Sequence, residues 1–171
     1  MEIDPLIVQL KGELDSKVYE ASDSLGKIGG EAVLNEMIIL LQHEQSDTRF
    51  LAARTLGLIE ENAIALDPLL EAIQTKENKT LAGDLMMNLE GFDLSAKYVE
   101  LFKLFLTGSF KVSVQAKELL DHKEFDITSR VIRKAKKHWE HYTNNAKQDE
   151  LFELRKVEVD EMLNDLQNFL D

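Results

Sequence analysis

The sequence repeats itself at an interval of about 31 residues. Five positions recur at that one offset, since Leu10, Ala21, Leu25, Gly26 and Ile28 match Leu41, Ala52, Leu56, Gly57 and Ile59. A third unit continues with Ile73, Ala82, Met86 and Leu89, and a fourth, after a longer spacing, with Leu104, Ala116 and Leu120. Such a period is typical of arrays in which each unit buries its apolar face against the next one.

Each repeated unit has the pattern of two amphipathic helices. Apolar residues such as Ala21, Leu25 and Ile28 are three or four positions apart, which is helical spacing. Asp-Pro opens two of the segments, where Asp can cap a helix and Pro can occupy its first turn. We therefore predict helix pairs at 5–13 with 16–28, 32–43 with 47–60, 68–75 with 78–90, and 96–107 with 111–122, followed by single helices from Asp126 to Tyr142 and from Asp149 to Leu170.

The segment from Asp47 to Ile59 carries the most informative motif, with Asp47 and Arg49 ahead of Ala52, Leu56 and Gly57. The unit from Asp15 to Ile28 repeats this pattern, whereas the third unit has Asn78-Lys79 in place of the Asp–Arg pair. The unit resembles the HEAT repeat, in the short bacterial form often called the phycobilisome-lyase HEAT-like repeat. This resemblance implies an α-solenoid whose second helices line a concave face, and it implies no particular activity.

We therefore predict an all-α protein with two parts. An α-solenoid of about four HEAT-like helix pairs occupies residues 1–125, and a C-terminal helical hairpin at 126–171 packs on the last repeat as a cap. We expect the repeat alanines to let helices approach closely, with Leu25, Leu56, Met86 and Leu120 filling the layer between them. The last helix could pair with a second copy instead, but we favour the cap, with an apolar side made of Leu151, Leu154, Met162, Leu163, Leu166 and Phe169.

The charge of the chain is negative and unevenly distributed. The total is −12, residues 1–75 hold 14 acidic and 5 basic side chains, and the +4 of residues 126–147 is followed by −6 in residues 148–171. A negative surface repels phosphate backbones and attracts basic partners, so a protein partner with basic character is favoured over nucleic acid.

Two groups of charged residues are candidate binding sites. Asp23, Arg54, Asp84 and Glu118 each stand two residues after a repeat alanine and should form a row along one face, as a partner-binding site or, as we favour for the first three, as pairs among themselves. Arg130, Arg133, Lys134, Lys136 and Lys137 form a possible anion-binding stretch. We favour its neutralisation by the acidic helix that follows, and we expect Trp139 and Tyr142 to pack on that helix.

The sequence lacks the residues that several kinds of catalytic, disulfide and metal sites require. The chain has no Cys, which excludes a disulfide scaffold, a thiolate zinc site and a cysteine nucleophile. His138 and His141 lie one helical turn apart, but without a third ligand in the motif we interpret them as a surface pair. We predict no catalytic, cofactor-binding or metal-binding residues. No apolar run is long enough to span a membrane, and the N-terminus has no export pattern, so we expect a cytoplasmic protein.

These observations favour a non-catalytic protein–protein interaction module, of the scaffold, adaptor or antidote type, that uses the concave face of an acidic solenoid. Two alternatives stay open. The resemblance suggests a lyase-type or accessory protein that acts on a tetrapyrrole-bearing partner. The basic stretch at 130–141 suggests nucleic-acid binding, which the overall acidity disfavours.

Overall fold

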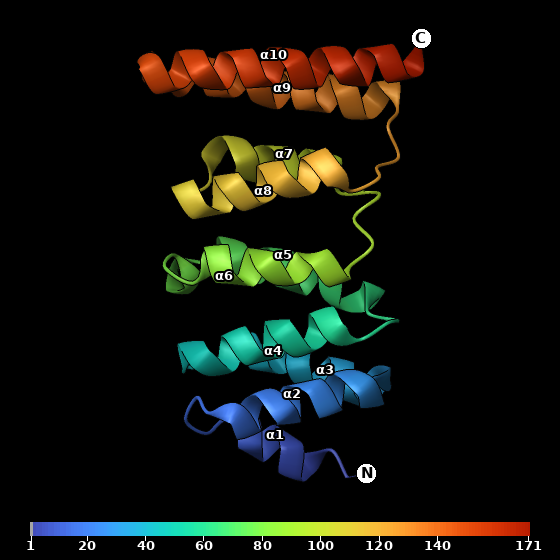
Figure 1. Cartoon of the computed structure of the whole chain (residues 1–171). Helices are drawn as coiled ribbons and strands as arrows, with labels where there is room; N and C mark the ends of the chain where they lie inside the picture. Colours follow the sequence, from blue (N-terminus) through green and yellow to red (C-terminus); the bar gives the residue numbers. More distant parts are fainter. Residues whose placement is uncertain (1) are drawn as a thin grey trace. The chain divides into compact units, whose positions relative to one another are not determined.

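The structure is a computed structural model that describes residues 2–171, and its regular secondary structure is entirely helical in that range (Figure 1). This confirms the prediction of an all-α fold built from helix pairs. Contacts divide the chain into two compact units, Met1–Asp93 and Leu94–Asp171, which we call the N-terminal unit and the C-terminal unit. Each unit is described by itself below.

The N-terminal unit contains the first three predicted helix pairs. Its helices are α1 (Asp4–Leu10), α2 (Ser16–Ile28), α3 (Gly30–Leu40), α4 (Ser46–Leu58), α5 (Leu66–Gln74) and α6 (Ala82–Met87). Three 3-10 turns lie between or after them: η1 (Ala63–Ala65), η2 (Lys76–Asn78) and η3 (Asn88–Gly91). Helices pack within each pair, and the central second helix, α4, also packs against α2, α6 and η3. The second helices therefore form one continuous layer.

The repeat residues are buried where successive second helices meet. Ala21, Ala52 and Ala82 are buried, and Leu56 is completely inaccessible. The repeated Leu-Gly pair needs its glycine because the neighbouring repeat packs directly against that position. A Cβ added at Gly26 would lie 2.6 Å from Cβ of Leu58, and one added at Gly57 would lie 2.7 Å from the carbonyl oxygen of Asn88. Both contacts connect one repeat to the next, which explains why the glycine recurs at the repeat interval.

The third pair departs from its predicted form. A single second helix was expected over 78–90, but α6 is limited to Ala82–Met87 and has a 3-10 turn on each side. The Asn78 side chain donates to the carbonyl oxygen of Ala72 at 2.8 Å, which holds Asn78 in the turn after α5. Side-chain bonds of this kind compete with helix formation, so the helix begins later than the apolar pattern predicts.

The C-terminal unit contains α7 (Tyr98–Thr107), α8 (Phe110–His122), α9 (Ser129–Asn145) and α10 (Glu150–Leu170). α7 packs against α8, as predicted for the fourth pair, and also against α9, which in turn packs against α10. Ala116 and Leu120 of the fourth unit are buried. The separation of a repeat array from a C-terminal hairpin at residue 125 stays a prediction about repeat architecture, since the contacts divide the chain after Asp93.

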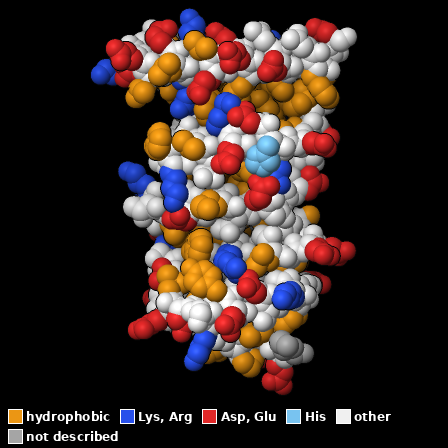
Figure 2. Space-filling model, in the orientation of Figure 1, with side chains coloured by type: hydrophobic (Ala, Val, Ile, Leu, Met, Phe, Trp, Pro, Cys, Tyr) orange, Lys and Arg blue, Asp and Glu red, His pale blue; other side chains and the backbone are white. Residues whose placement is uncertain are grey.

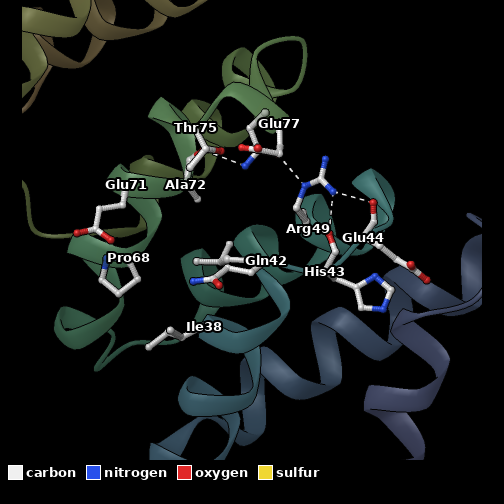
Figure 3. A pocket seen from close by; sticks show the side chains of 12 residues that line it. Ile38, Gln42, His43, Glu44, Arg49, Pro68, Glu71, Ala72, Thr75 and Glu77 are labelled. Carbon is white, nitrogen blue, oxygen red and sulfur yellow. Dashed lines mark hydrogen bonds between the residues drawn. The ribbon is translucent and has the colours of Figure 1, made fainter.

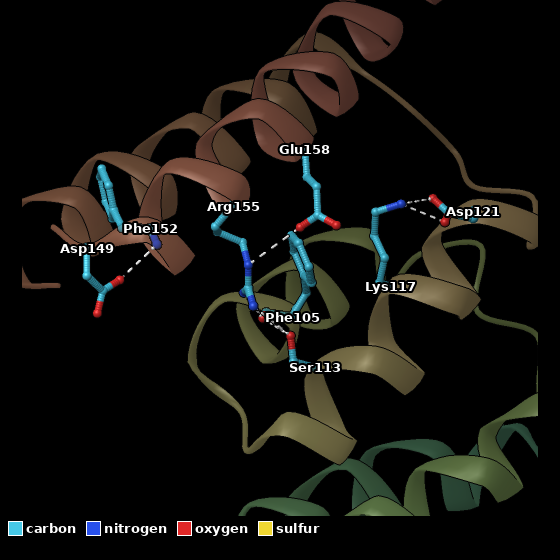
Figure 4. A network of polar contacts seen from close by, with 8 residues as sticks. All are labelled: Phe105, Ser113, Lys117, Asp121, Asp149, Phe152, Arg155 and Glu158. Carbon is cyan, nitrogen blue, oxygen red and sulfur yellow. Dashed lines mark hydrogen bonds and ion pairs between the residues drawn. The ribbon is translucent and has the colours of Figure 1, made fainter. Parts of the chain in front are cut away.

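Arg155 fastens α10 to the fourth helix pair (Figure 4). Its guanidinium donates to the carbonyl oxygen of Phe105 and, at 3.1 Å, to Oγ of Ser113. It also lies 4.2 Å from the centre of the Phe105 ring, and Glu158 approaches it to 3.8 Å. The Arg155 guanidinium therefore holds α10 in place by donating to one acceptor on α7 and one on α8.

The apolar side of α10 agrees with the predicted one at Leu163, which is buried, and differs from it near the two ends of the helix. Leu151, Leu154 and Phe169 are exposed by 75%, 65% and 72%, whereas Phe152, Val159 and Leu163 are buried. The Phe152 ring stacks on the rings of Trp139 and Tyr142, with centroids 6.0 and 6.3 Å apart. This stack sets the rotation of α10 and turns Leu151 outward. It also confirms that the two aromatic residues of α9 pack on the neighbouring helix.

The layer of second helices should depend on its central apolar residue. Leu56→Asp places a charge where no water reaches, and we expect it to destabilise the N-terminal unit by several kcal/mol, enough to abolish its folding. Leu58→Asp, two residues further along the same helix at a position that is 46% exposed, should cost much less. Thermal unfolding followed by circular dichroism measures both. Equal melting curves for the two variants would show that the layer is not the core of this unit.

Candidate binding surfaces

Asp23 and Arg54, two members of the predicted row, form an ion pair across neighbouring second helices. The carboxylate oxygen of Asp23 lies 2.7 Å from Nη2 of Arg54. Nη1 of Arg54 donates to Oγ of Ser22 at 2.7 Å, and the guanidinium lies 5.4 Å from the centre of the Tyr19 ring. The predicted pairing of these two charges is confirmed. The pair joins α2 to α4 on the side of the helices that faces solvent.

The other two members of the row lie on different helices from the ion pair. Asp84 is partly exposed on α6, in the same unit as the ion pair. Glu118 is exposed on α8 and belongs to the C-terminal unit. The structure thus brings Asp23 and Arg54 together, and a common partner-binding role of the four residues stays a prediction.

The acidic charge of the chain is concentrated in the N-terminal unit. Residues 1–93 hold 18 Asp and Glu against 7 Lys and Arg, a net charge of −11, whereas residues 94–171 hold 14 against 13, a net charge of −1. Exposed ion pairs contribute about 0–1 kcal/mol each. The Asp23–Arg54 pair, with side chains 48% and 26% exposed, is therefore one that a charged partner could exchange at little cost.

Arg49 belongs to the repeat motif but was not among the predicted binding residues, and the structure makes it a functional candidate. It lies in the first turn of α4 and is only 9% exposed. Its Nε donates to Oδ1 of Asn78 at 2.7 Å, and its Nη1 donates to the carbonyl oxygens of His43 and Glu44 at 2.7 and 2.9 Å. All three acceptors are neutral, and no carboxylate among residues 2–171 forms an ion pair with this guanidinium.

A pocket of about 740 Å³ lies beside Arg49, between the α3–α4 connection and α5 (Figure 3). Its apolar wall comes from Ile38, Leu41, Pro68 and Ala72. The polar residues on its lining are Gln42, His43, Glu44, Arg49, Glu71, Thr75, Glu77 and Asn78. This volume is within the range of about 300–1,000 Å³ that is usual for ligand sites.

The basic residues of α9 form no ion pairs with α10 within the described part of the chain. Arg130, Arg133, Lys134, Lys136 and Lys137 are all exposed, and across residues 2–171 none of the five forms an ion pair. The two helices do pack, but through the aromatic stack, and acidic side chains of α10 stand on the surface of that helix (Figure 2). The two helices pack as predicted, and the neutralisation of the basic stretch by the acidic helix stays a prediction.

Two further features belong to the surface of α9. A pocket of about 260 Å³ at its N-terminal end is lined by Arg133 and Lys136 together with residues from the end of α10. Near its other end, partial burial lowers the pKa of His138, and the positive charges of Lys103, His141, Lys134 and Lys137 lower it further. Cations from α7 and α9 therefore act on the same imidazole.

The described part of the chain has neither a metal-binding cluster nor a membrane-spanning helix. Within residues 2–171 no group of three His, Asp or Glu side chains is arranged to hold a metal ion. In the same range no helix combines the length and the apolar character that crossing a bilayer requires.

Comparison with protein families identifies the repeat. A model of HEAT repeats matches residues 3–90, which is just over half of the chain. The matched segment coincides with the three helix pairs of the N-terminal unit. It supports the repeat itself and says nothing about the short bacterial subtype. No curated protein matches the sequence.

The titration of His138 should report the cations around it. Lys103→Gln removes the positive charge on α7 that most disfavours the imidazolium, so the pKa of His138 should rise toward the ordinary value of about 6.5. NMR titration of the ring protons measures this. Lys147→Gln, in the loop after α9, provides a control with the same change in charge. Identical pKa values in both variants would show that Lys103 does not act on this imidazole.

Proposed function

Because the chain belongs to the HEAT-repeat family, whose modules generally serve as protein-interaction scaffolds, we propose that it binds another protein and carries out no chemical conversion of it. The binding surface is the face of the acidic N-terminal unit on which the second helices α2, α4 and α6 lie next to one another. The partner is a basic segment or a basic domain of another protein.

The distribution of charge carries this proposal. The N-terminal unit bears −11 of the total charge of −12, and the same unit contains the matched HEAT repeats. A surface of one sign speeds the encounter with a partner of the opposite sign and discourages partners of like sign. A repeated layer of helices also offers a broad, shallow surface, which suits an extended protein segment.

The ion pair between Asp23 and Arg54 supplies the exchangeable contact on that face. Arg54 is held in place by Ser22 and Tyr19 as well as by Asp23. A cation of the partner can therefore take over the Asp23 carboxylate while Arg54 keeps its other contacts. Asp84 adds a second carboxylate to the same unit, and Glu118 would take part if the partner also reached the C-terminal unit.

Charge reversal on α2 tests the proposal with a fluorescent lysine-rich peptide as the probe. The double variant Glu20→Lys with Asp23→Lys should weaken binding about tenfold, which corresponds to a loss of about 1.4 kcal/mol. The matched control, Glu150→Lys with Glu153→Lys on α10, changes the net charge by the same amount and should change the affinity by less than about twofold. Fluorescence anisotropy measures the affinity, and circular dichroism checks the fold.

Salt provides the second measurement on the same peptide. Raising the salt from about 50 to about 300 mM should weaken capture strongly, because exposed charges are screened over a shorter distance. Equal loss of affinity in both charge-reversed variants would contradict a localised site, and affinity that does not change with salt would contradict electrostatic capture.

A second candidate function is anion binding by α9. The observation that favours it is the absence, within residues 2–171, of ion pairs at five exposed cations, two of which, Arg133 and Lys136, line a pocket. Nucleic-acid phosphates would bind there through charge alone, because the Trp139 ring is occupied by its stack on Phe152 and is not available to a base.

A gel-mobility experiment with a short DNA duplex decides this second candidate. Intact protein should retard the duplex at low salt, and Lys136→Glu with Lys137→Glu should abolish the retardation. Lys76→Glu with Lys79→Glu, at two exposed positions of the N-terminal unit, is the control with the same change in charge and should leave it intact. No retardation by the intact protein ends this hypothesis.

A further inference from the structure

We propose that the pocket beside Arg49 binds a single carboxylate of the partner protein, with basic side chains of the same partner segment at the glutamates around its rim. The inference rests on the proposed function, because it specifies what part of a basic partner reaches the N-terminal unit. It adds a site and a ligand group that the charge distribution alone does not indicate.

The Arg49 guanidinium donates only to uncharged groups of the chain. Three of its five N–H groups donate to Asn78, His43 and Glu44, as described above, and each acceptor is an uncharged oxygen. A buried charge is costly unless an opposite charge accompanies it. Arg49 is nine-tenths buried and has no such partner within residues 2–171, so a bound anion would supply what the folded chain does not.

The remaining donor nitrogen of the Arg49 guanidinium, Nη2, is accessible to a ligand. Every buried side-chain nitrogen and oxygen among the described residues has a hydrogen-bond partner. Nη2 of Arg49 has no partner, and its two N–H groups are the remaining donors. Nη2 must therefore be accessible, and Arg49 lines the pocket shown in Figure 3. We place the ligand against this unused pair of donors.

The register of the repeats shows that Asn78 takes the place of a carboxylate. Asp15, Asp47 and Asn78 occupy corresponding positions, at intervals of 32 and 31 residues. The acceptor that faces Arg49 would thus be a carboxylate if the third repeat followed the first two. Asn78 fills the place with a neutral amide, whose nitrogen donates to the carbonyl oxygen of Ala72. The substitution keeps the hydrogen bond to Arg49 and removes its counter-charge.

The residues that line the pocket indicate the chemical class of the ligand. A carboxylate matches a guanidinium in geometry and in charge. Glu44, Glu71 and Glu77 are exposed and also line the pocket, so an anion is repelled there unless cations accompany it. The same three carboxylates favour lysine or arginine next to the bound group, and the apolar wall accepts the aliphatic parts of such side chains. These features select one acidic group within a basic peptide segment.

Three short peptides with lysines on both sides of a central position test this site on the full-length protein. The first has glutamate at the centre and blocked ends, the second has glutamine there and blocked ends, and the third has glutamine and a free C-terminal carboxylate. The protein should bind the first or the third about tenfold more tightly than the second. Tighter binding of the first assigns the group to an acidic side chain, and tighter binding of the third assigns it to a chain end.

Three variants show whether Arg49 makes the distinction. Arg49→Lys removes the planar donor pair, and Asn78→Asp supplies an internal carboxylate that competes with the ligand. Either variant should reduce the preference among peptides to less than about twofold. Arg54→Lys, on the same helix but outside the pocket, should keep the preference. In NMR spectra of the intact protein, the preferred peptide should shift the Nε–H signal of Arg49 and the backbone amides of Gln42 and Thr75.

The possible failures separate the two proposals. If the protein binds all three peptides equally, the carboxylate site is wrong and the capture of basic segments stands. If it binds none of them, both proposals are wrong. A preference that survives in a folded Asn78→Asp variant also overturns the role of Arg49, and this variant keeps the test decisive if Arg49→Lys does not fold.

Discussion

Direct contact between successive second helices is the constraint on which the N-terminal unit depends. At Gly26 and Gly57 the neighbouring repeat approaches so closely that a methyl group would overlap with it. Such proximity is possible only because small residues recur at the repeat interval. One face carries the Asp23–Arg54 pair, and the end of the layer places Arg49 against the turn that contains Asn78.

Two arginines of one helix therefore serve different purposes. Arg54 is partly exposed, has a carboxylate partner and belongs to a surface that charged partners can rearrange cheaply. Arg49 is buried, holds the next repeat through neutral acceptors and lines a pocket. The first arrangement suits rapid electrostatic encounter, and the second suits a specific contact after the encounter. Together they describe how one acidic unit could attract a basic partner and then select among basic partners.

The repeat pattern predicted the fold because burial in a helix layer leaves a periodic apolar signal. Ala52 and Leu56 could be assigned to the core from spacing alone, and both are buried. The burial of Arg49 could not be predicted in this way, because its acceptors depend on the shape of two turns and on Asn78, which is 29 residues away. The rotation of α10 was missed because Leu151 and Phe152 are adjacent and both apolar, so only the fit of Phe152 to Trp139 and Tyr142 decides which one is buried.

Hydrogen–deuterium exchange of the full-length protein, with and without the lysine-flanked glutamate peptide, tests the central claim most directly. The account predicts that the peptide slows exchange in α2, α4 and the turn at Lys76–Asn78, while the amides of α9 and α10 keep their rates. Slower exchange confined to residues 94–171 would contradict the account, because the partner would then bind outside the acidic HEAT repeats.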